Sequence, residues 1–459
     1  MLRLELGRTP AYCDGVNRRS FLQIGAAGLG AWGLEDVLRG RAAAAESGRP
    51  AKDTSVILIW LDGGPSHHDT YDPKPDAPAE YRGIWRHIPT NVPGMDVCEL
   101  FPRQAQLADR YSLIRSMHHD TGDHFTGGHW MLTGRGEVNG ANTPQRYPFI
   151  GSIATKMTGA RRAGMPANVA VPYAMSIGLR PGYFGGNYLG VDQNPFETEG
   201  DPNADQFQVT NLSSIAGLTL DRLDSRRQLI GGLDRLRRDA DQRGIVEAMN
   251  RFDQQAFDLV TGSAARDAFD ISTEPSISRE RYGRTSWGQS VLLARRLVEA
   301  GSTFVTCHFG GWDTHWDHQS AMERYLPQVD MAVSALISDL VERGLLDRVM
   351  VIVCGEFGRT PRMNDGGNGG PPLSQGTPGR DHWGNVMSVL VAGGGLKGGL
   401  VVGASDRLGE NPAERPLRPG DLHHTIFHVL GVDREIAFLN HSGRPIPAID
   451  HGELIHELV

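Results

Sequence analysis

The chain has 459 residues, of which 39% are hydrophobic and 22% are charged, and its formal net charge is −8. This length can bury one large core or two ordinary ones, and the composition excludes a disordered or fibrous chain. A net negative chain has no long-range field that attracts a polyanion, so we expect no nucleic-acid partner.

Residues 1–45 have the pattern of an export signal. The motif RRSFL at residues 18–22 precedes a Gly- and Ala-rich apolar run at 24–34, and small residues follow at 42–45. This pattern resembles a bacterial twin-arginine signal peptide, which predicts a periplasmic or otherwise exported protein that engages the twin-arginine export machinery. The alternative interpretation is an ordinary amphipathic first helix. The apolar run is too short for a stable membrane anchor, and no later stretch predicts a transmembrane helix.

The first predicted strand is Ser55 to Leu61, an unbroken apolar run that suits a central strand covered on both faces. A polar loop, DGGPSHHDT, follows it. The pattern then predicts a helix over Cys98 to Asp109 and a short strand over Ser112 to Ile114. That strand leads into SMHHDTGDHFTGGHWMLTG at residues 116–134, which holds four histidines and two aspartates.

A helical insertion is predicted at about 195–280, where Asp, Arg and Gln are dense and amphipathic patterns run over 223–241 and 244–260. Afterwards strands and helices alternate. Helices are predicted at 287–300 and 319–343, and strands at 303–308, 349–354 and 386–392. This alternation predicts an α/β fold with a mostly parallel central sheet and helices on both faces.

Potential metal ligands follow the predicted strands. Because parallel strands present their carboxyl ends at one edge, such residues converge there even when they are distant in sequence. The alternative is that the acids cap helices and the histidines are surface residues or orient other ligands. The candidate residues are Asp62 with His67, His68 and Asp69 after the first strand, Asp313 and His315 after the strand at 303–308, Glu356 after the strand at 349–354, and Asp381 and His382 in the next loop.

Other sequence patterns for catalysis are weak. No GxSxG motif lies between a strand and a helix, and GGG at 393–395 lacks the Lys and Ser/Thr of a phosphate-binding loop. HHTIFHVLG at 423–431 places two His four residues apart without the Glu of a zincin, which favours a C-terminal docking helix. The cysteines give no disulfide framework, and Cys307 and Cys354 lie in strand-like apolar runs where buried thiols are expected.

These motifs in combination resemble a known family. WLDGGPSHHDTYDPKP, GGWDTHWDH, GEFGRTP, GRDHW and AGGGLKGG, after an export signal, are similar to the bacterial domain-of-unknown-function 1501 proteins. That family is related to the alkaline phosphatase and sulfatase superfamily. The resemblance implies that residues 54–459 form an alkaline-phosphatase-like three-layer α/β sandwich that binds one or two divalent ions.

The resemblance also implies roles for individual residues. Asp62 corresponds to a metal ligand after the first strand, and Glu356 to a later acidic ligand. Many relatives have an Asp-His or Asp-Asn pair where this chain has Glu356-Phe357, so the two-metal arrangement is in doubt here. Asp313 with His315, and Asp381 with His382, are the replacements.

The usual nucleophile is absent from its expected position. In sulfatases it lies nine residues before a Thr that corresponds to Thr133, and that position holds His124. We interpret His124 as a metal ligand, and a covalent phosphoryl acceptor is the alternative. Thr121 and Thr126 are the nearest hydroxyl groups, and either could serve as the nucleophile if the loop were shifted, with water as the other candidate. The start of a helix near Thr126 would then help to hold an anionic oxygen.

The leading hypothesis is an exported metal-dependent hydrolase of sulfate or phosphate esters. Its ligands would be drawn from Asp62, His124, Asp313, His315, Glu356, Asp381 and His382. The His content favours Zn or Mn over Ca or Mg. Arg359 and Arg380 would clamp substrate oxygens or orient Glu356 and Asp381.

Two other functions stay open at this point. One is a catalytically silent, metal-containing binding or assembly protein of the cell envelope, and the other is a phosphomutase or transferase. The substrate would be an anionic ester, with a sulfated or phosphorylated glycan as one candidate.

Overall fold

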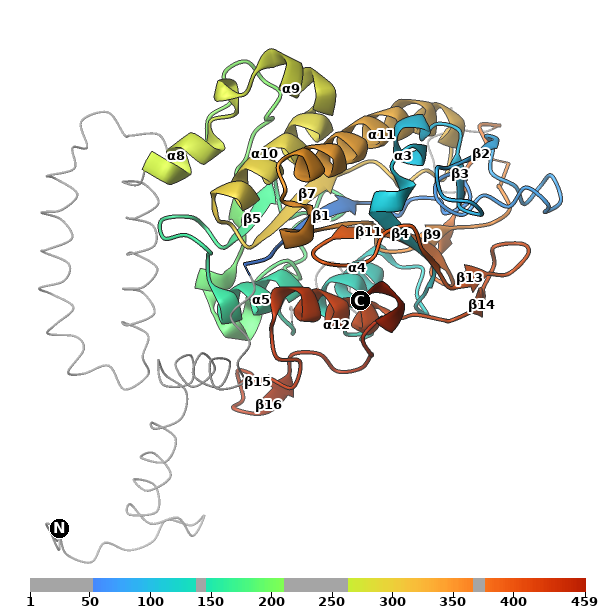
Figure 1. The fold of residues 1–459 in the computed structure, drawn as a ribbon. Helices are drawn as coiled ribbons and strands as arrows, with labels where there is room; N and C mark the ends of the chain where they lie inside the picture. The colour runs from blue at the N-terminus through green and yellow to red at the C-terminus, as the bar shows by residue number, and fades with distance from the viewer. Residues whose placement is uncertain (1–52, 138–145, 210–262, 366–375) are drawn as a thin grey trace, which may run out of the picture. The chain divides into compact units, whose positions relative to one another are not determined.

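A mostly parallel sheet forms the centre of the fold in the described part of the chain (Figure 1). Its eight strands follow the order β12-β4-β11-β8-β1-β7-β5-β6. β11 runs antiparallel to both β8 and β4, whereas every other neighbouring pair is parallel. The expected mostly parallel sheet is therefore confirmed, with one reversed strand. The strands are β1 (Ser55–Leu61), β4 (Tyr111–Met117), β5 (Asn168–Val171), β6 (Phe196–Glu197), β7 (Phe304–Phe309), β8 (Val349–Cys354), β11 (Met387–Gly393) and β12 (Val401–Val402).

The computed structural model describes residues 53–137, 146–209, 263–365 and 376–459. The predicted signal peptide at 1–45 and the amphipathic patterns at 223–241 and 244–260 lie outside the described residues. Within them, no helix has the length and apolar character that crossing a membrane requires.

The side chains of β1 show how the sheet supports two cores. All seven residues of β1 are buried. Ile57, Ile59 and Leu61 belong to one hydrophobic cluster, and the alternate residues Val56 and Leu58 belong to a second. Because successive side chains of a strand point to opposite faces, these clusters are the two faces of one sheet. The unbroken apolar run is thus explained by burial on both faces.

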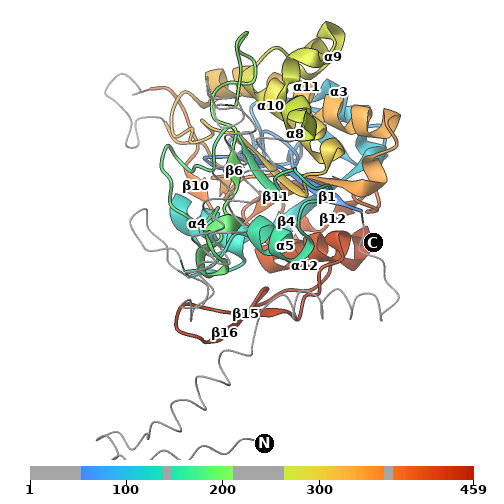
Figure 2. The same cartoon turned by 90° about the vertical axis from the view of Figure 1, so that its left-hand side faces the viewer.

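Helices cover each face, which makes the predicted three-layer α/β sandwich (Figures 1 and 2). One layer holds α3 (Pro102–Ala105), α8 (Ser263–Phe269), α9 (Ser276–Tyr282), α10 (Ser286–Ala300) and α11 (His318–Glu342). The other holds α4 (His124–Thr133), α5 (Ile150–Thr158) and α12 (Pro419–Leu430). α10 packs on β1 and β7, and α12 packs on α4 and α5. The docking helix expected at 423–431 is α12.

Most predicted elements match within a few residues, and one prediction was wrong. α10 begins after Thr285, whose side chain caps the helix, and ends at Gly301. The region from Cys98 to Asp109 is not a continuous helix. Cys98 ends β3, a four-residue helix with Pro102 at its first turn follows, and a short 3-10 helix begins at Ala108. Proline has no N–H to donate and is tolerated in that first turn, so the helix starts there.

Four short two-stranded ribbons accompany the main sheet in the residues that the structure describes. They are β2 (His87–Pro89) with β3 (Asp96–Cys98), β9 (Gly358–Arg359) with β10 (His382–Trp383), β13 (Ala404–Ser405) with β14 (Pro412–Glu414), and β15 (Ala437–Leu439) with β16 (Pro445–Pro447). The β9–β10 ribbon places His382 opposite Arg359. Both are residues that the sequence analysis named as site candidates. The GGG at 393–395 is a turn, as expected, with positive φ at all three residues.

Candidate metal centre

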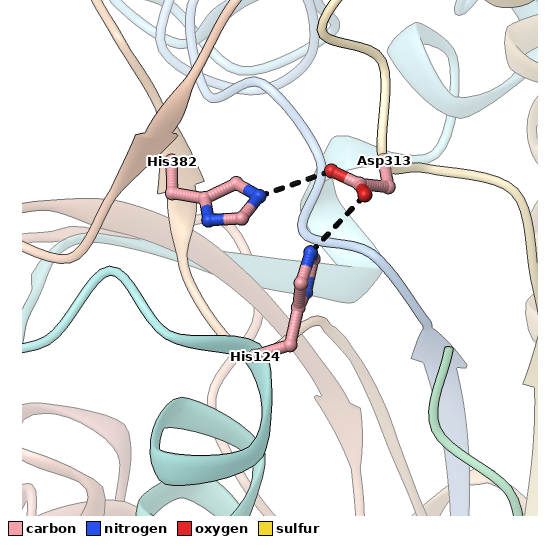
Figure 3. A group of neighbouring side chains, drawn as sticks. All are labelled: His124, Asp313 and His382. Atoms are coloured by element: carbon pink, nitrogen blue, oxygen red, sulfur yellow. Dashed lines mark hydrogen bonds and ion pairs between the residues drawn. The ribbon is translucent and has the colours of Figure 1, made fainter. Parts of the chain in front are cut away.

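Side chains from three separate elements meet beyond the carboxyl ends of the central strands (Figure 3). His124 is the first residue of α4, Asp313 follows β7, and His382 lies in β10. His382 Nε2 lies 3.0 Å from Asp313 Oδ1, and His124 Nε2 lies 3.3 Å from Asp313 Oδ2. One potential ligand atom from each residue lies within 4.8 Å of the others. Sequence positions 124, 313 and 382 therefore form one cluster in space.

His315 joins this cluster from the loop after β7. Its Nε2 lies 3.0 Å from Asp313 Oδ1 and 2.8 Å from His382 Nε2. Three imidazoles thus direct the same ring nitrogen, Nε2, at one carboxylate.

The opposite nitrogen, Nδ1, is anchored in all three rings. Nδ1 of His124 lies 2.6 Å from Glu356 Oε1, and Nδ1 of His315 lies 2.7 Å from Asp381 Oδ1. Nδ1 of His382 lies 2.6 Å from the carbonyl oxygen of Gly122. Carbonyl and carboxylate oxygens only accept, so each Nδ1 carries the donated proton. In the neutral ring Nε2 then presents its lone pair to Asp313, which is how metal-binding histidines are oriented.

The Nε2 atoms lack enough hydrogen-bond partners of their own. His124 Nε2 is buried and makes no hydrogen bond in the described structure, although it lies at ion-pair distance from Asp313. The Nε2 atoms of His315 and His382 face each other at 2.8 Å, where two lone pairs repel unless a proton or a cation lies between them. Three imidazole nitrogens and a carboxylate suit a divalent ion such as Zn or Mn. The residues present therefore fit a metal site.

Protons stabilise the cluster when no metal is bound. Burial disfavours the charged ring of His124, but the carboxylates of Asp313 and Glu356 beside the ring outweigh this effect and raise the pKa of His124 to about 9. Burial also opposes ionisation of Asp313, yet its imidazole partners hold the pKa of Asp313 far below its ordinary value. Burial raises the pKa of Glu356, and its hydrogen bond to His124 works against that shift. A metal ion would compete with these protons.

Gly63 brings the loop after β1 close to the metal centre. Its N–H donates to Glu356 Oε1 at 2.9 Å, and Glu356 in turn holds His124. Gly63 has a φ of +116°, and a Cβ there would lie 2.4 Å from the backbone nitrogen of Asp313. Only glycine combines this backbone conformation with such a close approach.

Arg359 is fully buried, and its guanidinium hydrogen bonds to oxygen atoms of the protein. Its guanidinium donates to the carbonyl oxygens of Gly63, Gly64 and Arg380, and to Asp313 Oδ1 at 2.7 Å. The structure thus places Arg359 as a brace between the loops after β1, β7 and β8. The sequence left two roles open for Arg359, which were to clamp substrate oxygens or to orient an acidic side chain. The contacts match the orienting role, and the acid that Arg359 orients is Asp313.

Arg380 is also fully buried. It donates to Asp69 Oδ2 at 2.8 Å and to the carbonyl oxygens of Arg82, Thr360 and Pro361. These contacts fix the backbone immediately before Asp381 and His382. The Asp69 carboxylate also accepts from His318 Nε2 at 3.0 Å. The sequence places Asp69 with His67 and His68 in the loop after the first strand, among residues of metal-ligand type, and the structure gives Asp69 this supporting position instead.

Asp62 lies outside the His124, Asp313 and His382 group. Its carboxylate accepts from Ser176 Oγ at 3.0 Å and from the N–H of Ile177 at 2.7 Å, and it lies 3.0 Å from His308 Nε2. Glu356 and Asp381 hold imidazole Nδ1 atoms rather than facing the centre. Of the seven predicted ligands, the structure therefore brings His124, Asp313 and His382 together, and His315 lies against Asp313 and His382.

The two predicted hydroxyl groups lie beside the start of α4. Thr126 Oγ1 donates to Asp123 Oδ1 at 2.8 Å, and Thr121 Oγ1 accepts from the N–H of Asp123 at 3.1 Å. The helix begins at His124, two residues earlier than expected, because Asp123 caps it.

Phe357 is buried against the rings of His124 and His382, with centroid distances of 4.9 and 4.6 Å. It closes one side of the centre.

Comparison with known proteins identifies a family and several similar folds. A family model described as "Protein of unknown function (DUF1501)" matches residues 53–459. No curated protein matches the sequence. Among solved structures, the chain is similar to a phosphonate monoester hydrolase from Silicibacter pomeroyi, with 13% identity, a TM-score of 0.36, and coverage of 89% of this chain and 76% of that one.

Two further solved structures are similar at the same level. A sulfatase from a Pseudoalteromonas species has 14% identity, a TM-score of 0.32, and coverage of 92% of this chain and 73% of that one. An alkaline phosphatase from the Antarctic bacterium TAB5 has 11% identity, a TM-score of 0.36, and coverage of 84% of this chain and 100% of that one.

Proposed function

The chain belongs to the DUF1501 family of proteins of unknown function, and from the geometry of its own site we propose that it is an exported metal-dependent hydrolase of phosphate or sulfate esters. One observation carries the proposal. Three imidazoles, each anchored through Nδ1, direct Nε2 at the carboxylate of Asp313. The sequence resemblance to the alkaline phosphatase and sulfatase superfamily supports the choice of ester chemistry.

His124, Asp313, His315 and His382 would hold one divalent ion. When bound, such an ion supplies Lewis acidity toward an anionic ester oxygen and lowers the pKa of a water from about 16 to about 7. Glu356 and Asp381 fix the ring orientation of His124 and His315, which preorganises the site before the metal arrives. The fully buried guanidinium of Arg359 offsets the negative charge of Asp313, so that an anionic substrate meets less repulsion.

Water is the proposed nucleophile. In the described part of the chain, no Ser, Thr or Cys side chain hydrogen bonds to any of the four proposed ligands. The hydroxyl groups of Thr121 and Thr126 are engaged with Asp123. The N-terminal turn of α4, which begins at His124, would favour negative charge on a substrate oxygen.

The test combines metal analysis with turnover. Purified protein should contain one Zn or Mn per chain and should hydrolyse 4-nitrophenyl phosphate or 4-nitrophenyl sulfate. His382→Gln should lose both properties. His87→Gln is the matched control, because His87 also pairs with an acid, Asp96, but lies on the β2–β3 ribbon. Metal-free protein that stays inert toward both esters after metal addition would exclude the proposed function.

A catalytically silent binding protein is the second candidate. The observation that favours it is Phe357, an apolar ring packed against two proposed ligands at a position where the superfamily resemblance implies a polar ligand. This candidate requires stoichiometric metal without turnover of any ester. It also requires that His124→Ala still binds sulfated or phosphorylated polysaccharide as the unmodified chain does.

A further inference from the structure

Asp69 is a buried carboxylate that connects two loops of the metal centre. Its Oδ2 accepts from Arg380 Nε at 2.8 Å, from His318 Nε2 at 3.0 Å and from Ser66 Oγ at 2.6 Å. Its Oδ1 accepts from the N–H of Ile84 at 2.8 Å. None of the four proposed metal ligands is among these partners, so any effect of Asp69 on the metal passes through the residues that it holds.

Arg380 connects Asp69 to the loop that carries His382. The side chains of Arg380 and Asp69 are both 0% exposed. Removing one member of such a buried pair leaves the other charge uncompensated, so the two side chains are held together strongly. Arg380 directly precedes Asp381 and His382 in the chain. The position of Arg380 therefore fixes where this ligand-bearing segment begins.

His318 connects Asp69 to the loop that carries Asp313 and His315. A carboxylate only accepts, so the ring donates Nε2–H to Asp69. The other ring nitrogen, Nδ1, lies 2.7 Å from Thr314 Oγ1. Thr314 is 5% exposed and stands between Asp313 and His315 in the chain. The hydrogen-bonded path from Asp69 thus ends between two proposed ligands.

The two loops also meet directly. The N–H of Arg380 donates to the carbonyl oxygen of Thr314 at 3.1 Å. Gly379 permits this approach, because a Cβ there would lie 2.0 Å from the carbonyl carbon of His315. Beyond this junction, Nε2 of His315 and Nε2 of His382 lie 2.8 Å apart. The spacing of these two ring nitrogens therefore depends on how the loops are joined.

We propose that Asp69 is a positioning residue that sets the spacing between the loop of Asp313 and His315 and the loop of His382. The proposal rests on the metal-dependent function proposed above. A ligand set that is already in place loses less conformational freedom when the ion binds, so its affinity is higher. Residues that orient metal ligands from outside typically change metal affinity about 10- to 100-fold.

The test compares two buried acids of the loop after β1. Asp69→Asn keeps the size of the side chain but removes its charge. Asp72→Asn is the matched control, because Asp72 is also buried, at 2% exposed, but its carboxylate pairs with Lys74 at 3.0 Å and accepts from Ser405. Both variants therefore lose a buried charge, and only one of these charges is joined to the ligand-bearing loops.

Three properties are measured in each variant. Competition with a chromogenic chelator gives the zinc affinity. The visible spectrum of the Co(II)-substituted protein reports the arrangement of the ligands around the ion. Hydrogen exchange of the Arg380 N–H in the metal-free protein reports the junction between the loops.

We expect Asp69→Asn to weaken zinc affinity about 10- to 100-fold, to shift the Co(II) bands and to speed exchange at Arg380. Asp72→Asn should leave all three properties unchanged. A folded Asp69→Asn protein with unmodified zinc affinity and Co(II) bands would overturn the proposal. Equal changes in both variants would also overturn it, because they would show a general effect of losing a buried charge.

A second pair of variants keeps the proposal testable if Asp69→Asn does not fold. Thr314→Val keeps the shape of the side chain and removes the hydroxyl group that meets His318. It should weaken zinc affinity and shift the Co(II) bands, and Thr314→Ser, which keeps a hydroxyl group, should restore both. Identical behaviour of Thr314→Val and Thr314→Ser would contradict the path from Asp69.

The measurements also separate this proposal from the function on which it rests. An unmodified chain that binds no zinc would overturn the metal-dependent function. Exchange at Arg380 needs no metal, so in that case it alone decides whether Asp69 joins the two loops.

Discussion

Asp313 is the residue on which the candidate metal centre depends most. The Nε2 atoms of His124, His315 and His382 and the guanidinium of Arg359 all lie within 3.3 Å of its carboxylate oxygens. Removing its charge leaves those imidazoles without a shared anion, and it removes the one carboxylate that faces the centre.

Asp313→Asn should abolish stoichiometric metal binding, whereas Asp381→Asn should weaken it about 10- to 100-fold. Asp381 holds Nδ1 of His315, and the loss of such an outer partner typically has that size. Competition with a chromogenic chelator measures both affinities. Asp317→Asn is the control, because Asp317 lies in the same loop after β7 as Asp313 but its carboxylate accepts from Ser320 Oγ. Equal effects in Asp313→Asn and Asp381→Asn would contradict the assigned roles.

The raised pKa of His124 predicts how the stability of the metal-free protein depends on pH. His124 titrates near 6.5 when unfolded and at about 9 in the folded protein. The folded state binds the extra proton, so this stabilisation is complete below pH 6.5 and is lost as pH rises to 9. The loss is at most about 3 kcal/mol. Urea unfolding with chelator present should show this decline, and His124→Gln should remove it.

At the scale of elements, the loop after β1 must pass very close to the loop after β7. Gly63→Ala would place a Cβ 2.4 Å from the nitrogen of Asp313 and would also strain a φ of +116°. We expect a loss of at least about 2 kcal/mol in the free energy of unfolding, with weaker metal binding. Gly94→Ala is the matched control, because Gly94 has a φ of +83° but nothing within 4 Å of its Cβ position. Similar losses in both variants would show that close approach at Gly63 is unimportant.

The sequence predicted strands and long helices well because their patterns are regular. Ser55 to Leu61 and Val349 to Cys354 were located correctly from their apolar runs. The segment from Cys98 to Asp109 was not, because a roughly helical spacing of apolar residues outweighed the proline at 102 in the prediction. Cys98, the first residue of that segment, instead pairs with His87 in the β2–β3 ribbon. Short elements with few apolar residues depend on tertiary contacts that a single sequence does not reveal.

The sequence located the site more readily than it assigned roles within it. Asp313, His315, Glu356 and Asp381 all follow strands, so their convergence at one sheet edge was predictable. Which of them faces the centre depends on side-chain orientation. Glu356 and Asp381 point to the Nδ1 atoms of histidines, and no spacing in the sequence distinguishes that arrangement from direct coordination.

At the scale of the whole molecule, buried neutral histidines make the fold sensitive to acid. Burial lowers the pKa of His67, His119 and His423 to about 4 in each case. Below pH 6.5 the unfolded chain takes up these protons and the folded chain does not, so stability falls as pH decreases from 6.5 to 4. Each residue contributes up to about 3 kcal/mol of this loss.

Chemical denaturation between pH 4 and 7 measures this dependence. His423→Gln should reduce the proton uptake on unfolding by about one near pH 5. Stability that stays constant down to pH 4 would contradict the burial of these rings.

The most direct measurement of the central claim is an anomalous-scattering map from crystals of the protein grown with zinc. We predict one strong peak about 2.0–2.2 Å from Nε2 of His124, Nε2 of His382 and an oxygen of Asp313, with Nε2 of His315 as the further nitrogen ligand. A peak at another place in the molecule, or no peak beside Asp313 at saturating zinc, would contradict the assignment of this cluster as a metal centre.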